Sequence, residues 1–397
     1  MEKILNPKLK TYASYDPTKV TKQLSITELC EKIDEGSLVL PIFQTYLRWT
    51  KQKAVELFNY QLMGKAPVAP ISVNLIKNPT NVVKQITFIN RTLVSDNDID
   101  GKESVADGQQ RISTNYRAYK NDPEFNDIVL DVVDGEFTIV SKINKYQIPV
   151  GILYNEDDDV FFNYVDNNKF LSSREVKNTL LLIRQKFQKY YYILNYAQDL
   201  NKKEQMEWFD VLNLAGSRVT GVMVHLTDML EKGVDFYTEY AIPFGKKLDE
   251  AGLGHLFIRK TTEVSIPLAA LNAAYEVVKN KERSNNFSPI PSDEKAELLG
   301  KCEQKEIRRI FDMTLTSLDT TLDVISTIKD DVNRIDIISY LIGVFVYNDV
   351  NKFTVEAKGE LITWVKEVKF TNLSNTQRRE EYSNLLNKFK QDVKISS

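Results

Sequence analysis

Residues 104–119 read SVADGQQRISTNYRAY, so an Asp-Gly pair, two glutamines and an arginine stand between an apolar step and a helical pattern. The residues before the pair favour a short strand, and Ile112, Tyr116 and Tyr119 fall on one helical face after it. The stretch therefore predicts a strand, a turn at the glycine and a helix. Five residues at this turn carry an unusual amount of hydrogen-bonding capacity.

Two readings of the DGQQR turn stay open from the residues alone. In the first, Asp107 is the helix N-cap and Gln110 completes a variant capping box, so that each side chain satisfies a backbone N–H group. In the second, the helix N-terminus binds an anion, Gly108 lets the ligand approach the backbone, and Arg111 grips phosphate oxygens. The residues that would then bond the phosphate, the sugar or an attacking water are Gln109, Ser113 and Thr114. Both readings predict that truncating Arg111 leaves folding almost unchanged.

Two further segments carry polar residues in suggestive places. LPIFQTYLRWT, residues 40–50, follows an apolar strand and ends in Gln44 and Arg48, which suit the same anionic ligand. We expect both to lie close to the DGQQR turn. In residues 208–226, Asn213 and Gly216 interrupt a helical pattern and predict a second turn.

The rest of the chain predicts an α/β half followed by a mainly helical half. Helices are expected at 24–36, with Ser25 as N-cap, and at 51–64, closed by Gly64. The expected strands are SLVLPIF, APISVNLI, QITFI, EFTIVS, YQIPVGILY and VFFNYV. From about residue 172, beginning with SSREVKNTLLLIRQKFQKYYYILNYA, long helical segments dominate. We expect one domain over residues 1–235 and a helical domain over residues 236–397.

Composition limits the class of protein. Hydrophobic residues make up 42% of the 397 residues, and no run approaches the roughly 18 apolar residues of a membrane span. The polar N-terminus has no signal-peptide core, so a cytoplasmic protein without membrane contact is expected. The net charge of −3 argues against a general nucleic-acid coat. Cys30 and Cys302 match no metal or redox spacing and are predicted to be reduced and buried.

Metal chemistry built on protein ligands has little support in the sequence. The two histidines, His225 and His255, are too few for common zinc sites or for an HNH nuclease. The acidic run NEDDD at 155–159 is read as a solvated turn without function, because consecutive carboxylates do not converge on one ion. No metal-ligating residue is therefore assigned.

At these three stretches the sequence resembles the DGQQR-motif (ParB/sulfiredoxin-like) family of GmrSD-type Type IV restriction systems and related phage-defence proteins. Pro41-Ile42-Phe43-Gln44 with Trp49, residues 107–114, and Asn213 with Gly216 match the family pattern in order and rough spacing. The resemblance implies a ParB/sulfiredoxin-like N-terminal domain. It also implies binding and hydrolysis of a nucleoside triphosphate, GTP or ATP, with Mg²⁺ assisting, linked to restriction of modified DNA.

The resemblance also assigns roles to individual residues. Asp107, Gln110 and Arg111 become the catalytic residues. The expected nucleotide-binding residues are Gln44, Arg48, Gly108, Gln109, Ser113, Thr114, Asn213 and Gly216. The sequence departs from the family pattern at Thr45, where arginine is usual, and it shows no C-terminal HNH nuclease.

The leading hypothesis is a nucleotide-hydrolysing switch subunit of a restriction or phage-defence system. A separate nuclease subunit would then cut the DNA, and self-association of the chain stays open. One alternative is a module that senses nucleotide or DNA without turnover, which Thr45 makes plausible. The other is a ParB-like nuclease that acts on DNA directly.

Overall fold

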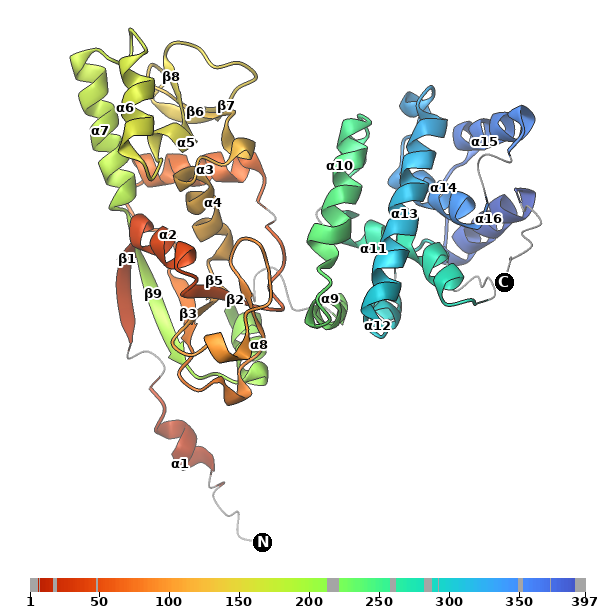
Figure 1. The fold of residues 1–397 in the computed structure, drawn as a ribbon, viewed down its shortest axis with the longest axis horizontal. Coiled ribbons are helices and arrows are strands. Elements are labelled where there is room, and N and C mark those ends of the chain that lie inside the picture. The colour runs from red at the N-terminus through yellow and green to blue at the C-terminus, as the bar shows by residue number, and fades with distance from the viewer. Residues whose placement is uncertain are drawn as a thin grey trace. The chain divides into compact units, whose positions relative to one another are not determined.

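The computed structural model describes residues 6, 8–16, 20–47, 49–212, 221–257, 262–281, 288–291, 293–348, 353–371 and 373–389. The chain divides into two compact units, Met1–Val219 and Thr220–Ser397, so the division falls earlier than the expected boundary after residue 235. Unit 1 is mixed α/β and unit 2 is mainly helical, which confirms the predicted fold class (Figure 1). The closer likeness to ParB and sulfiredoxin stays a prediction.

Unit 1 is built on a mixed six-stranded sheet with the strand order β1-β9-β3-β5-β2-β4. Its strands are β1 (Thr21–Ser25), β2 (Leu38–Pro41), β3 (Ile71–Leu75), β4 (Gln85–Thr87), β5 (Glu103–Asp107) and β9 (Tyr191–Gln198). β5 runs parallel to β2, with Leu38 opposite Glu103, and antiparallel to β3. The carboxyl ends of β2 and β5 therefore meet at the same edge of the sheet.

The helices of unit 1 include the two that frame the sequence motifs. They are α1 (Lys8–Ala13), α2 (Ile26–Asp34), α3 (Lys51–Met63), α4 (Gln109–Tyr119), α5 (Val150–Leu153), α6 (Asp158–Asp166), α7 (Arg174–Gln188) and α8 (Lys202–Leu212). The predicted start of α2 is confirmed, because Ser25 and Glu28 form a capping box. The predicted end of α3 is confirmed too, since Gly64 is its C-cap.

α4 and α8 cover opposite faces of the sheet. Asn115 of α4 donates from Nδ2 to Tyr192 Oη at 3.0 Å. The pairing register puts Tyr192 on the same face as Val73, so the next residue, Asn74, points to the other face. There Asn74 Oδ1 accepts a hydrogen bond from the N–H of Leu200, just before α8, at 3.1 Å.

A second, three-stranded sheet completes unit 1, in the order β7-β6-β8. Its strands are β6 (Ile128–Asp131), β7 (Glu136–Ile139) and β8 (Gln147–Pro149). An aromatic cluster of Phe58, Phe137, Tyr154 and Phe187 packs beside it, with the last two rings stacked at 3.8 Å. This cluster ties the small sheet to α3 and α7 through buried apolar area.

One predicted strand is wrong. VFFNYV, residues 160–165, lies in helix α6. Asp157 caps this helix, because its side chain accepts the N–H of Asp159 at 2.8 Å. Phe161 and Val165, one turn apart, are both buried. Helical spacing and an N-cap thus outweigh the strand propensity of aromatic and β-branched residues, and the acidic run before them serves as the cap.

One predicted helix is too long. The helix expected to continue through YYYILNYA ends at Gln188, and Tyr191–Gln198 forms β9. In β9 buried and exposed residues alternate from Tyr191 to Tyr196, which is the period of a strand. This missed strand lies inside the sheet, between β1 and β3.

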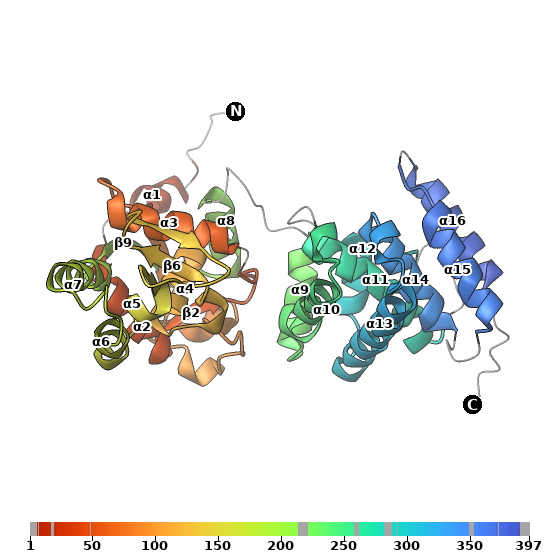
Figure 2. The same cartoon turned by 90° about the horizontal axis from the view of Figure 1, so that it is seen from above.

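Unit 2 is an assembly of helices packed around α14 (Ile335–Tyr347), which is buried over most of its length. The others are α9 (Gly221–Glu231), α10 (Ile242–Glu250), α11 (Thr262–Val278), α12 (Asp293–Gly300), α13 (Gln304–Ile325), α15 (Val355–Glu367) and α16 (Asn375–Lys388). Trp364 Nε1 donates to Glu381 at 2.8 Å and joins α15 to α16, which lie side by side (Figure 2).

Two composition-based expectations can be compared with the structure. Cys30 and Cys302 are free and buried, as predicted, and burial raises the pKa of both thiols. Within the described ranges, no helix combines the length and apolar character needed to cross a bilayer.

Candidate functional site

The DGQQR segment forms a strand–glycine–helix turn. β5 ends at Asp107, and Gly108 follows in the left-handed region with φ +106° before α4 begins. A Cβ atom at position 108 would lie 2.9 Å from Cγ1 of Ile71. Glycine is therefore required both for the backbone conformation and for the packing of Ile71. Ile71 occupies the space through which a ligand was expected to approach the backbone.

The capping-box reading is wrong. The N-cap of α4 is Gly108, which has no side chain to offer, and Asp107 is one residue too early. The Asp107 carboxylate instead accepts a hydrogen bond from Nη2 of Arg111 at 2.9 Å. Its side chain remains 40% exposed. Asp107 is thus an ion-pair partner at the turn.

Arg111 ties the helix to the beginning of β3. Its Nη1 donates to the carbonyl of Ala69, and its Nη2 donates to the carbonyl of Pro70 at 3.2 Å. The Arg111 side chain is only 12% exposed. Most of the guanidinium fork that a phosphate would use is therefore directed at protein oxygens.

Gln44 lies next to the DGQQR turn, which confirms the predicted proximity of the two segments, whereas a role of Gln44 in ligand binding stays a prediction. It is buried, and its Nε2 donates to the carbonyls of Val105 at 3.2 Å and Ala106 at 2.8 Å. β2 and β5 are parallel neighbours, so the segments after them leave the sheet at the same edge. Arg48 lies outside the described residues.

The two glutamines of the motif fasten the segment after Gln44 to the helix. Gln109 Nε2 donates to the carbonyl of Thr45 at 3.1 Å. Gln110 Oε1 accepts from the N–H of Trp49 at 3.1 Å, and its Nε2 lies 3.5 Å from the carbonyl of Tyr46. Thr45, Tyr46 and Trp49 are thus held at the start of α4 by bonds between side chains and backbone.

Arg91 is a site residue that could not be picked out from the sequence. Its side chain is buried, with 4% exposure, and its Nη1 donates to the carbonyl of Gln44 at 3.0 Å. Its backbone has φ +53°, which is unusual for a residue with a side chain. A buried guanidinium next to the motif could be suspected only from the arginine in the turn-rich NRT stretch, which is a weak signal.

Other predicted ligand contacts point into the protein. Ser113 is buried, and its Oγ has no partner among the described residues. Thr114 is buried as well and donates to the carbonyl of Gln110 at 2.8 Å within α4. Neither hydroxyl faces solvent in this conformation. Asn213 and Gly216 lie outside the described residues.

The groups still available at the turn are few. The backbone N–H groups of Gln109 and Arg111 have no acceptor among the described residues, because the first intrahelical bond is donated by Ile112 to Gly108. The second carboxylate oxygen of Asp107 is also unpaired within those residues. No group of three potential metal ligands occurs in the described part of the chain. The turn can offer two amides, one carboxylate oxygen and an arginine held close by.

The sequence of unit 1 matches a known protein family. Residues 26–221 match the family model described as GmrSD restriction endonuclease, N-terminal domain. The match begins at the first residue of α2 and ends at the first residue of α9, so it spans nearly all of unit 1. A search of curated proteins found no match. The N-terminal unit of this chain belongs to the GmrSD restriction endonuclease N-terminal domain family, which indicates a role in DNA restriction or phage defence.

Proposed function

We propose that unit 1 binds a nucleoside triphosphate at the DGQQR turn and hydrolyses it, and that this controls a nuclease on a partner subunit. The observation that supports the proposal is the gathering of the free α4 amides, Asp107 and Arg111 at one turn. A helix N-terminus favours anions through its unpaired N–H groups and its dipole. An arginine beside it suits a phosphate.

The residues divide into two roles under this proposal. Asp107 and Arg111 face the phosphates. Arg111 stabilises charge that develops on the terminal phosphate, and the free oxygen of Asp107 orients the attacking water. Gln44, Gln109 and Gln110 act as positioning residues, because Gln44 is bonded to the end of β5 and the other two already hold Thr45 and Trp49.

Mg²⁺ fits this turn only as an ion shared with the nucleotide. Mg²⁺ sites at phosphates use one or two carboxylates, with water and phosphate oxygens supplying the other ligands. The turn provides the Asp107 carboxylate, one oxygen of which pairs with Arg111, so the other oxygen would hold the ion through a coordinated water. Bound in this way, the ion would neutralise phosphate charge.

The partner nuclease is part of the proposal because of the histidines in this sequence. His225 lies in α9, 3.5 Å from Asp228, and His255 lies in η5 (Gly254–Leu256), where its Nδ1 is 3.2 Å from the carbonyl of Gly252. Each contacts groups of its own local segment. This placement supports assigning DNA cleavage to another subunit.

A sensor that binds nucleotide without turnover is the second candidate. It is favoured by one observation: the three glutamine side chains and most of the Arg111 fork are engaged by protein oxygens and N–H groups. Such a turn can recognise phosphate through its amides while lacking a free carboxamide to align water.

Phosphate release separates the candidates. The full chain is incubated with GTP or ATP and Mg²⁺, and thermal shift reports binding. We expect stabilisation and phosphate release in the wild type, and a loss of turnover of about a hundredfold in Asp107→Asn with binding retained. Lys203→Ala is the matched control, because this lysine is 85% exposed and lies on α8.

Each result decides between the readings. Binding without phosphate release identifies the sensor. Absence of both leaves the turn a structural clamp and rejects the proposal. Metal-dependent cleavage of plasmid DNA by the chain alone, retained in Arg111→Lys, points to the ParB-like nuclease alternative and a site elsewhere.

A further inference from the structure

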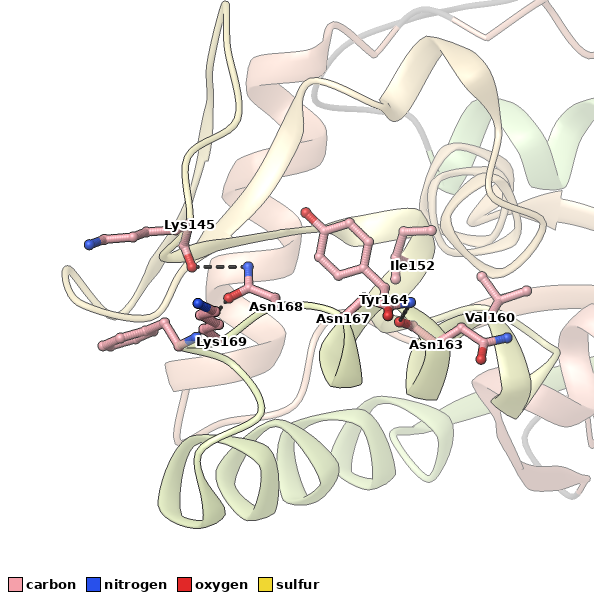
Figure 3. A pocket seen from close by; sticks show the side chains of 9 residues that line it. Lys145, Ile152, Val160, Asn163, Tyr164, Asn167, Asn168 and Lys169 are labelled. Atoms are coloured by element: carbon pink, nitrogen blue, oxygen red, sulfur yellow. Dashed lines mark hydrogen bonds between the residues drawn. The ribbon is translucent and has the colours of Figure 1, made fainter.

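A pocket of about 1050 Å³ opens on unit 1 beside α6 (Figure 3). Val160, Asn163 and Tyr164 of α6 and its C-cap residue Asn167 follow helical spacing along one wall of the pocket. The opposite sides come from Lys145 before β8, from α5, and from the residues just after α6. The volume lies just above the range for small-molecule sites, roughly 300–1000 Å³.

Hydrogen bonds of the Asn168 side chain fasten one wall of the pocket. Asn168 donates from Nδ2 to the carbonyl of Lys145 at 3.1 Å, and its Oδ1 accepts the N–H groups of Phe170 and Leu171 at 3.0 and 3.1 Å. The turn after α6 is therefore fastened to the segment before β8. A preformed pocket loses little conformational entropy when a ligand binds.

Arg184 of α7 fixes the beginning of α6 through hydrogen bonds. It is almost fully buried and donates to the carbonyls of Leu153 at 2.9 Å and Asn155 at 2.6 Å. The same guanidinium bonds the Asp158 carboxylate at 2.6 Å. These bonds fix the junction between α5 and α6, from which the lining residues of both helices extend.

The pocket contains aromatic surface of fixed orientation. Tyr164 is half-buried, and its hydroxyl donates to the carbonyl of Gln147 at 3.3 Å. Phe170 is half-buried and packs edge-on against Tyr146 at 4.7 Å between ring centroids. In Figure 3 the Tyr164 ring and Ile152 lie between one end of the pocket, at Lys145 and Lys169, and the other end, at Val160 and Asn163. Rings held in this way stack well on a planar ligand.

Unpaired amide groups lie next to this apolar surface. The side chain of Asn163 is exposed and has no hydrogen-bond partner among the described residues. Asn167 donates from Nδ2 to the carbonyl of Asn163 at 2.9 Å and keeps its Oδ1 free within those residues. An amide that offers a donor and an acceptor side by side matches the edge of a nucleobase.

The charge of the pocket is uneven. Lys145 and Lys169 lie at one end and Val160 and Asn163 at the other (Figure 3). Neither lysine has an ion-pair partner within the described residues, and the Lys145 ammonium rests 4.9 Å from the Tyr146 ring centroid. The lysine end therefore favours an anionic group, while the amide end is uncharged.

We propose that this pocket binds a nucleobase together with its phosphate, with the base against Tyr164 and Asn163 and the phosphate near Lys145 and Lys169. Aromatic surface, a free amide and an unneutralised cationic end are the combination that nucleotide recognition requires. The base can come from a single DNA strand, from a nucleotide turned out of a duplex, or from a free nucleotide.

This site is separate from the DGQQR turn and does not rest on the function proposed for it. The N–H of Glu156, just before α6, donates to the carbonyl of Tyr119, the last residue of α4, at 3.0 Å. α4 has 11 residues, so its two ends are about 16 Å apart. The pocket thus adjoins the end of α4 that is remote from Gly108.

Binding of a fluorescent single-stranded oligodeoxynucleotide to the full chain tests the proposal by anisotropy at low salt. Asn163→Leu keeps the side-chain size and removes the amide. We expect it to weaken binding about tenfold, within the loss known for a bidentate amide–base contact. Lys169→Gln should weaken binding several-fold and lower the salt dependence by about one phosphate contact.

Matched controls are Asn97→Leu and Lys203→Gln, two exposed positions outside the pocket, which should leave binding unchanged. Nucleoside monophosphates, which lack the triphosphate group, form the second arm as competitors. Competition identifies a pocket for single nucleotides, and binding of the strand without competition identifies a strand-held base. Equal weakening by pocket and control variants, or no binding of either probe, overturns the proposal.

Discussion

Truncation of Arg111 tests the structure at the turn most directly. The guanidinium donates to the carbonyls of Ala69 and Pro70 and pairs with Asp107. Arg111→Ala removes all of these contacts at once and releases α4 from the start of β3. The sequence alone predicts almost no effect of this substitution on folding, whereas the hydrogen bonds in the structure predict a loss of stability. The substitution therefore distinguishes the two predictions.

The loss of stability expected for Arg111→Ala depends on how exposed each hydrogen-bond partner of the guanidinium is. Ala69 and Pro70 are exposed residues, so water replaces the guanidinium at their carbonyls, and each bond contributes about 0.5–1 kcal/mol. The Asp107 carboxylate is 40% exposed, and such a pair contributes about 0–1 kcal/mol. The expected loss is therefore about 1–3 kcal/mol, or roughly a 5- to 150-fold change in the unfolding equilibrium. Arg111→Lys should lose about half as much, because it keeps the charge and loses the fork.

Native-state hydrogen exchange of β3 and β5 is the appropriate measurement, because a chain with two units gives a bulk unfolding curve that mixes both. Lys203→Ala is the control. This lysine pairs with Glu207 at 3.6 Å and is 85% exposed, so its removal should change stability by less than about 0.5 kcal/mol. If Arg111→Ala leaves exchange of both strands as in this control, the guanidinium does not clamp the turn.

Three further predictions concern the stability of unit 1. Gly108→Ala should destabilise it by about 1–3 kcal/mol, because the glycine has φ +106° and a Cβ would lie 2.9 Å from Ile71, and unchanged native-state hydrogen exchange of β5 would contradict the packing described. Gln44→Leu should cost about 1–3 kcal/mol in the same assay, since it removes the amide donor from two buried carbonyls of β5, whereas a neutral result would show that their other donors suffice. Burial alone would raise the pKa of Asp131, but hydrogen bonds, of which that from Gln147 is the strongest, lower it below its usual value. This carboxylate therefore stabilises the fold at pH values above its unfolded pKa, and the contribution is lost as the pH falls through the folded pKa. Asp131→Asn should therefore flatten the acid limb of a stability–pH curve, and an unchanged limb would assign acid sensitivity to other groups.

The convergence of Gln44 with the DGQQR turn could be predicted, and the bonds of Arg111 could not. Both segments come directly after apolar strands, and two parallel strands that pair bring the residues after them to one edge of the sheet. The acceptors of Arg111 are backbone carbonyls, which every residue carries, so no pattern of side chains identifies them. The same limit hid the bonds from Gln109 to Thr45 and from Trp49 to Gln110.

Errors in the local structure have a different cause. The predicted N-cap at Asp107 is wrong because the helix begins one residue later, and element ends are uncertain by one or two residues in any sequence reading. Because Asp107 lies one residue before the N-cap position, its carboxylate pairs with Arg111 and does not cap the helix. The strand predicted at residues 160–165 failed because period and propensity disagreed, and the cap at Asp157 favoured the helix. That helix is the one that lines the pocket of Figure 3.

The bonds at the turn also set a condition on any nucleotide that binds there. At the start of α4, a phosphate would meet the N–H groups of Gln109 and Arg111, which have no acceptor among the described residues. To reach the guanidinium it must compete with Asp107 and with two carbonyls at the start of β3. Recruitment of Arg111 would therefore loosen the attachment between α4 and β3, while Gln109 and Gln110 keep Thr45 and Trp49 in place. In a nucleotide-controlled protein, that exchange of partners would link the state of the phosphate to the packing of α4 on the sheet. The link depends on the backbone carbonyls that Arg111 bonds, and not on its charge alone.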